Sequence, residues 1–127
     1  MKNLANFQFQ SHVIRGKNRS RQEDFFPTIN LEIINKEKNF LENYSYHGVY
    51  LVEALIGKEI YIGLLHFGPK KTFEEGNSIE LLIPEFIFEI ERKNVKIKII
   101  KKIRNIYKFK NISELKKQIQ VDLDQFL

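Results

Sequence analysis

Cysteine is absent from the chain. Disulfide bonds, thiolate zinc sites and cysteine nucleophiles are therefore excluded, and cysteine usage leaves the redox compartment open. Glycine and proline are scarce, with 6 and 3 residues, and no segment is of low complexity. This composition excludes a collagen-like or Gly/Pro-rich disordered chain, so we expect a folded protein.

Long apolar segments are missing as well. The longest ones, such as 51–56 with Glu53 inside it, fall far short of the roughly 18 residues that a membrane-spanning helix needs. The N-terminal residues 1–6 contain one basic residue but no apolar run of signal-peptide length. We therefore expect a cytoplasmic protein without a membrane span.

The length of 127 residues predicts one domain over 1–127, built around one hydrophobic core. Alanine, the strongest helix former, occurs only 2 times, whereas isoleucine occurs 18 times. Isoleucine and aromatic residues favour strands. The composition thus favours a mostly β domain, and the bias toward Ile, Lys and Asn is also typical of an AT-rich genome.

The order of the residues supports strands. Apolar and polar residues alternate over 7–13 and over 25–33, which is the pattern of half-buried strands. Two further runs, 46–55 and 59–67, flank Gly57, and the freedom of glycine to adopt positive φ suits a tight hairpin. The remaining predicted strands lie at 78–83, 86–91 and 95–100.

The last two of these strands are predicted to form a hairpin with a turn at 92–94. Apolar residues of both strands share the core face, and acidic residues of one strand face lysines of the other in solvent. The expected neighbours are Phe88 and Ile90 with Val95 and Ile97, and Glu89 and Glu91 with Lys96 and Lys98.

Near the C-terminus, apolar residues recur at spacings of three and four, which predicts an amphipathic helix over about 113–127. Ser113 is a suitable N-cap. The stripe expected to pack on the sheet comprises Leu115, Ile119, Leu123 and Phe126. The residues expected to face solvent are Lys116, Lys117, Asp122 and Asp124.

Short strands at close spacing, one terminal helix and no βα alternation predict a mainly β fold, a small antiparallel barrel or curved sandwich with one C-terminal amphipathic helix. The loop 16–19 leading to Pro27, the turn and strand 75–81 and the hairpin 86–100 resemble short bacterial proteins whose barrel is similar to the C-terminal β-barrel of translation elongation factor Tu. The resemblance covers about 7–103. It implies a barrel that binds partners and has no GTPase centre.

Motifs for catalysis are missing. The chain has no glycine-rich phosphate-binding loop and no nucleophile elbow. His12, His47 and His66 are far apart in sequence, and we interpret them as structural histidines and keep a metal-assisted hydrolase as a third alternative. The adjacent pair Glu74 and Glu75 is interpreted as a solvated turn. The sequence therefore predicts no catalytic residue, no metal site and no cofactor.

The strongest functional signal is electrostatic. Residues 92–110 carry nine basic side chains and no acidic one, and a second basic cluster occupies 15–21. Such clusters neutralise phosphates, but lysines also protect the edge strand of a sheet from aggregation. Both interpretations remain open. The candidate contacts with an anionic partner are Arg15, Lys17, Arg19, Arg21, Lys96, Lys98, Lys101, Lys102 and Arg104.

These observations favour a small non-catalytic binding protein that engages a protein partner, for example a toxin-neutralising immunity protein. The alternative is an RNA-binding module that uses the basic clusters at 15–21 and 92–110. We expect a monomer or a weak dimer, because Pro27 and Lys96 are placed to protect sheet edges.

Overall fold

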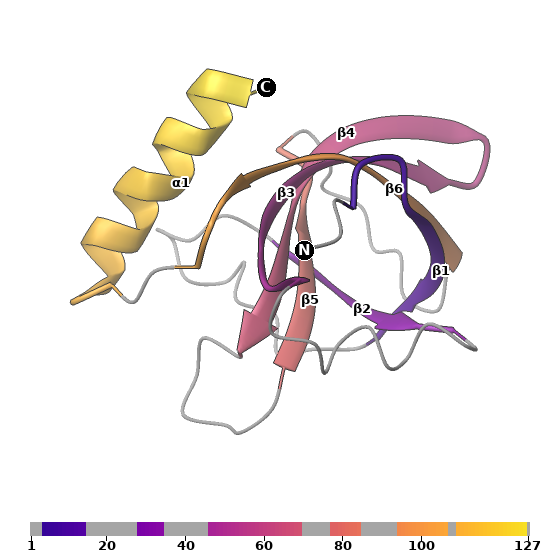
Figure 1. Ribbon diagram of the computed structural model, residues 1–127, viewed down its shortest axis with the longest axis horizontal. Coiled ribbons are helices and arrows are strands. Elements are labelled where there is room, and N and C mark those ends of the chain that lie inside the picture. The colour runs from indigo at the N-terminus through magenta and orange to yellow at the C-terminus, as the bar shows by residue number, and fades with distance from the viewer. Residues whose placement is uncertain are drawn as a thin grey trace.

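The computed structural model describes residues 4–14, 28–34, 46–69, 77–84, 94–106 and 109–126, and the structural statements below concern these residues. The strands are β1 (Gln8–Val13), β2 (Ile29–Ile33), β3 (Gly48–Ile56), β4 (Glu59–Pro69), β5 (Asn77–Leu82) and β6 (Asn94–Arg104), and the helix is α1 (Ile112–Phe126) (Figure 1). Within this part of the chain, no helix has the length and apolar character needed to span a membrane.

The strands close into an antiparallel barrel in the order β1-β2-β5-β4-β3-β6. Strand β6 completes the closure, because it pairs with β1 along one edge and with β3 along the other. The predicted mainly β fold, a barrel with one C-terminal helix, is confirmed. The edge-protecting role considered for Lys96 is wrong, since closure leaves β6 without an open edge at this position.

The pairing predicted for the hairpin 86–100 is also wrong. Val95 lies opposite Ser11 of β1 and opposite Ile56 of β3, so both of its edges are taken by other strands. Residues 85–93 lie outside the described residues. The strand predicted at 95–100 lies within β6, but alternation within a strand does not identify its partner, and here the partners are distant in sequence.

Apolar side chains from all six strands fill the barrel. Every second residue points inward, so that Val95, Ile97 and Ile99 of β6 are each 0% exposed. Ser11 is buried among them because its hydroxyl donates a 2.8 Å hydrogen bond to the Val95 carbonyl. The hairpin β3–β4 turns at Gly57, whose φ of 63° favours glycine, as predicted.

Helix α1 lies outside the barrel and packs against its outer surface (Figure 1). Ile119 and Leu123 form a second apolar cluster with Leu64 of β4 and Leu82 of β5. The predicted apolar stripe of the helix is therefore confirmed at these two positions. This cluster, which we call the helix cluster, covers one part of the outer barrel surface and leaves the neighbouring part to polar residues.

The start of α1 differs from the prediction. Asn111 caps the helix in place of Ser113, because Asn111 Oδ1 accepts a 2.9 Å hydrogen bond from the Glu114 backbone N–H. Glu114 Oε2 in turn accepts a 3.3 Å hydrogen bond from the backbone N–H of Lys110. Asparagine and serine are both good caps, so residue type alone did not decide between the two positions.

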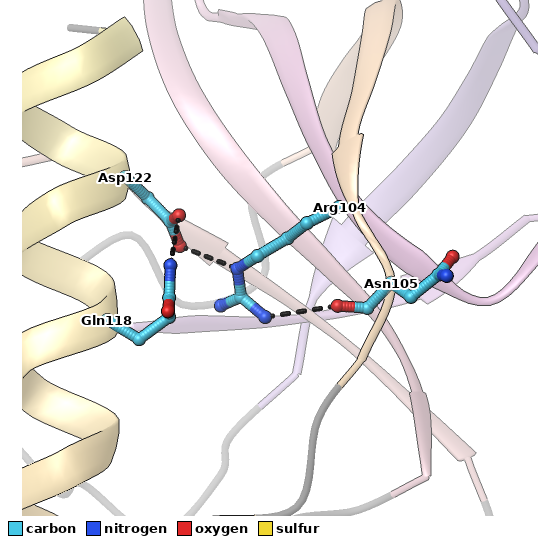
Figure 2. A network of polar contacts seen from close by, with 4 residues as sticks. All are labelled: Arg104, Asn105, Gln118 and Asp122. Carbon is cyan, nitrogen blue, oxygen red and sulfur yellow. Dashed lines mark hydrogen bonds and ion pairs between the residues drawn. The ribbon is translucent and has the colours of Figure 1, made fainter.

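Asp122, which was predicted to face solvent, is instead 3% exposed. Its Oδ2 accepts a 2.9 Å hydrogen bond from Arg104 Nε, and its Oδ1 accepts a 3.0 Å hydrogen bond from Gln118 Nε2 (Figure 2). Arg104 Nη1 also donates to the carbonyl of Asn105 at 3.1 Å. The carboxylate can be buried because the guanidinium group of Arg104, at the end of β6, forms an ion pair with it.

Candidate active site

A polar cluster crosses β2, β5 and β4 on the outer surface of the barrel. Asn30 of β2 lies opposite Glu80 of β5, and Glu80 lies opposite His66 of β4. Directly opposed residues project from the same face of a sheet. Because Ile79 and Leu81 beside Glu80 point into the core, these three polar side chains point outward together.

The Glu80 side chain is only 11% exposed and has a polar neighbour on each side. Its Oε1 accepts a 3.4 Å hydrogen bond from Thr28 Oγ1. Its Oε2 lies 4.0 Å from Nδ1 of His66, whose side chain is 13% exposed. Carboxylates are seldom buried to this extent unless they are paired or functional, so Glu80 is the candidate centre of the site.

The helix cluster lies next to this carboxylate along the strands. Leu64 and Leu82 lie opposite each other two residues along β4 and β5 from His66 and Glu80, and α1 covers them. Apolar surroundings exclude water and strengthen electrostatic interactions nearby. On the other side, Glu32 of β2 is 54% exposed, so the cluster opens toward solvent in that direction.

The donor set defines what the cluster can do chemically. A positioned carboxylate accepts a proton from a reacting hydroxyl group. The oxygens of Thr28 and Asn30 are hard donors of the kind that Mg²⁺ accepts when phosphate oxygens supply its other ligands. Among the described residues no group of three or more His, Cys, Asp or Glu could hold a metal ion.

Among the described residues, the basic ones predicted to contact an anionic partner do not form one site with Glu80. Arg104 forms the ion pair with Asp122, and Lys101 Nζ lies 5.1 Å from the centroid of the Phe126 ring of α1. None of the described basic candidates lies on β2, β4 or β5. Lys96, Lys101 and Lys102 are exposed on β6, and Lys98 is half-buried there. Arg15, Lys17, Arg19 and Arg21 lie outside the described residues.

The sequence interpretation missed Thr28, Asn30 and Glu80. Asn30 and Glu80 were placed in the predicted strands 25–33 and 78–83, but 50 residues separate them and only the register of β2 with β5 brings them together. The histidines are dispersed. His12 lies 3.8 Å from Glu32, whereas His47 packs against Phe67 with ring centroids 5.3 Å apart.

The fold and this cluster together define a small closed barrel with a shielded carboxylate and oxygen donors on its outer wall. Residues 4–127 match the model of the flavokinase family, described as riboflavin kinase. The chain belongs to the riboflavin kinase family.

Relatives with known names support this assignment. The chain is 36% identical over 118 residues to a bifunctional riboflavin kinase/FMN adenylyltransferase of Bacillus subtilis strain 168, a match that covers 87% of this chain and 34% of that protein. It is 30% identical over 115 residues to the RNA-binding riboflavin kinase RibR of the same strain, covering 87% of this chain and 46% of that protein. The chain thus spans about a third to a half of these relatives.

Among solved structures, a macrolide-efflux protein from Streptococcus pneumoniae superposes with a TM-score of 0.78 at 26% identity. The match covers 96% of this chain and 38% of that one. The barrel and its helix therefore recur together as one part of a longer protein.

Family membership corrects three expectations. The resemblance to the elongation factor Tu barrel is wrong, because the matching family is riboflavin kinase. The expected non-catalytic protein-binding or immunity role is wrong, because this family consists of enzymes. An RNA-binding module in place of an enzyme is wrong for the same reason. Strand patterns and turn residues recur in many small barrels, so they did not distinguish one barrel family from another.

Proposed function

We propose that the chain transfers a phosphoryl group from a nucleoside triphosphate to a hydroxyl group of riboflavin. The shielded carboxylate of Glu80, 11% exposed and hydrogen-bonded by Thr28, carries this proposal. Family membership and the names of the relatives support it. The adenylyltransferase activity named for the bifunctional relative is left out, because the chain spans only 34% of that protein.

In this reaction Glu80 acts as the general base. The riboflavin hydroxyl oxygen attacks the γ-phosphorus, and its proton passes to a Glu80 carboxylate oxygen. The bond from the γ-phosphorus to the bridging oxygen breaks, and the nucleoside diphosphate leaves. Most of the catalysis of phosphoryl transfer comes from positioning and from stabilising charge, and the Thr28 hydrogen bond to Oε1 restricts the orientation of the base.

Thr28 and Asn30 are proposed to meet the magnesium-bound phosphates of the nucleotide. Thr28 immediately precedes β2, and Asn30, the second residue of β2, lies directly opposite Glu80. A magnesium nucleotide commonly uses one or two protein oxygens and completes its coordination with phosphate oxygens and water. Contacts at Thr28 and Asn30 would hold the γ-phosphoryl group beside the base. The metal ion neutralises charge on the phosphates when the nucleotide is bound.

The experiment is a direct assay of the purified chain with riboflavin and magnesium ATP. The proposal predicts that phosphorylated riboflavin and ADP form in equal amounts, measured by chromatography of the flavin and of the nucleotide. Absence of the phosphorylated flavin, with the protein folded by circular dichroism, would contradict it. Release of ADP without the flavin product would instead indicate a different phosphoryl acceptor, and would equally overturn the riboflavin assignment.

An anionic partner of β6 is a second candidate. Lys96 and Lys102 are exposed on this strand, and one relative is named as an RNA-binding riboflavin kinase, so RNA is the class to test. Replacing Lys96 with Gln should reduce the slope of log affinity against log salt by about 1. Binding that does not depend on salt would contradict this proposal.

The cytoplasmic location and the monomeric or weakly dimeric state predicted from the sequence remain proposals.

A further inference from the structure

His66 lies beside Glu80 although the proposed chemistry assigns it no role. The two residues are directly opposite each other on β4 and β5. Both side chains are almost buried, at 13% and 11% exposed, and Nδ1 of His66 lies 4.0 Å from Oε2 of Glu80. The imidazole therefore lies beside Oε2, whereas the Thr28 hydroxyl contacts Oε1.

The surroundings of His66 hold its ring in place. Val49 of β3 lies opposite His66 on the other side of β4 and is 4% exposed. Two residues along β4, Leu64 belongs to the helix cluster. A side chain confined by packed neighbours has few alternative rotamers. The His66 side chain is thus held between Val49 of β3 and Glu80 of β5.

Glutamate has several rotatable bonds, so a glutamate base that is held at only one oxygen can turn away from its substrate. Thr28 restrains Oε1 of Glu80 by a hydrogen bond. Nδ1 of His66 lies 4.0 Å from Oε2, beyond hydrogen-bond distance, so a proton on Nδ1 would act on the carboxylate by electrostatic attraction and oppose this rotation. The reacting hydroxyl group would approach the part of the Glu80 side chain that is exposed, which is 11%.

We infer that His66 is a positioning residue that holds the Glu80 carboxylate in the orientation needed to accept the proton. The inference rests on the proposed function, because it concerns the orientation of the proposed base. It concerns His66 acting through Glu80, without contact between His66 and the substrate. Misplacing a reacting group by about 1 Å can reduce the rate by about a hundredfold.

The test compares His66→Leu, His66→Asn and His66→Gln with the wild type. Leucine fills space without an N–H donor, and the two amides supply one. His66→Leu should lower kcat by about tenfold to a hundredfold, with KM for riboflavin and for ATP changed by less than about twofold. At least one amide variant should recover part of kcat. His12→Leu, on the same outer face but paired with the exposed Glu32, is the matched control and should keep the wild-type kcat.

A double-mutant comparison separates positioning from a general structural effect. In a Glu80→Gln background, His66→Leu should cause no further loss, because the base that it positions is gone. A wild-type kcat for His66→Leu, or losses that multiply in the double variant, would overturn the inference. If the wild type phosphorylates riboflavin and Glu80→Gln does not, a His66→Leu variant with wild-type kcat refutes only the role of His66, and the proposed function stands. If the wild type is inactive, the proposed function fails first.

A second measurement applies should His66→Leu fail to fold. The imidazole nitrogen resonances of His66 are recorded by NMR in the wild type and in Glu80→Gln, and assigned by their loss in His66→Asn. Neutralising the carboxylate should shift the Nδ1 resonance more than it shifts any resonance of His12. Unchanged His66 resonances would show that Glu80 does not contact the ring electrostatically, and would overturn the inference.

Discussion

At the residue scale, burial distinguishes Glu80 from other acidic residues on the same face. Glu32 of β2 also points outward, but its side chain is 54% exposed and its neighbour His12 is 36% exposed. Glu80 lies beside the helix cluster and is 11% exposed. Alternation in the sequence places both residues outward, but it does not report what covers them. Glu80 has the Thr28 hydroxyl and the helix cluster nearby, and both Thr28 and α1 are distant from β5 in sequence.

Tyr50 gives a prediction at the same scale. The side chain is 2% exposed, and its hydroxyl donates a hydrogen bond to the Tyr46 carbonyl. Burial, with a smaller contribution from Tyr46, raises the pKa of Tyr50 from 10.0 to about 12. Because the folded pKa is the higher one, the stability from the neutral phenol is complete below pH 10 and is lost as the pH rises toward about 12.

Tyr50→Phe tests this prediction because phenylalanine cannot ionise. Its free energy of unfolding should be lower than that of the wild type at neutral pH, since the hydrogen bond is lost, by about 1 kcal/mol. Between pH 10 and 12 the wild type should lose stability more steeply than the variant. Urea unfolding at several pH values measures both slopes. Parallel pH dependences would show that Tyr50 does not titrate differently in the folded state.

At the element scale, α1 is held by an apolar stripe and by one buried ion pair. The spacing of Ile119 and Leu123 predicted the stripe, because helical periodicity is local to the element. The burial of Asp122 was not predictable in this way, since it depends on Arg104, 18 residues earlier on another element. Charged residues on a predicted helix are assigned to solvent by default, and a partner on the facing strand reverses that assignment.

Asp122→Ala should therefore destabilise the protein strongly. Arg104, whose side chain is 12% exposed, would lose the carboxylate that pairs with it. Removing one partner of a buried ion pair costs about 3–5 kcal/mol. Asp124→Ala is the control, because Asp124 is exposed and accepts one hydrogen bond from Gln120. Its effect should stay within about 0.5 kcal/mol. Equal losses in the two variants, measured by urea unfolding, would refute a stabilising role for the pair.

At the scale of the whole molecule, closure of the barrel sets the position of every site residue. Five strand segments, the Gly57 hairpin and the terminal helix were predictable from local patterns, and β6 was placed correctly in sequence. The pairing of β6 with β1 and β3 was not predictable from local patterns, because register across a closed barrel is a long-range property. The site was missed for the same reason, since Asn30, His66 and Glu80 meet only through the register of β2, β5 and β4.

Proton transfer to Glu80 is the central step of the proposed mechanism, and the kcat of Glu80→Gln for phosphorylation of riboflavin is its sharpest test. Glutamine keeps the shape of the side chain but cannot accept the proton at neutral pH, so kcat should fall by about 10²–10⁴-fold. Glu32→Gln, an exposed residue on the same face, should keep the wild-type value. A Glu80→Gln variant with wild-type kcat would contradict the proposed mechanism.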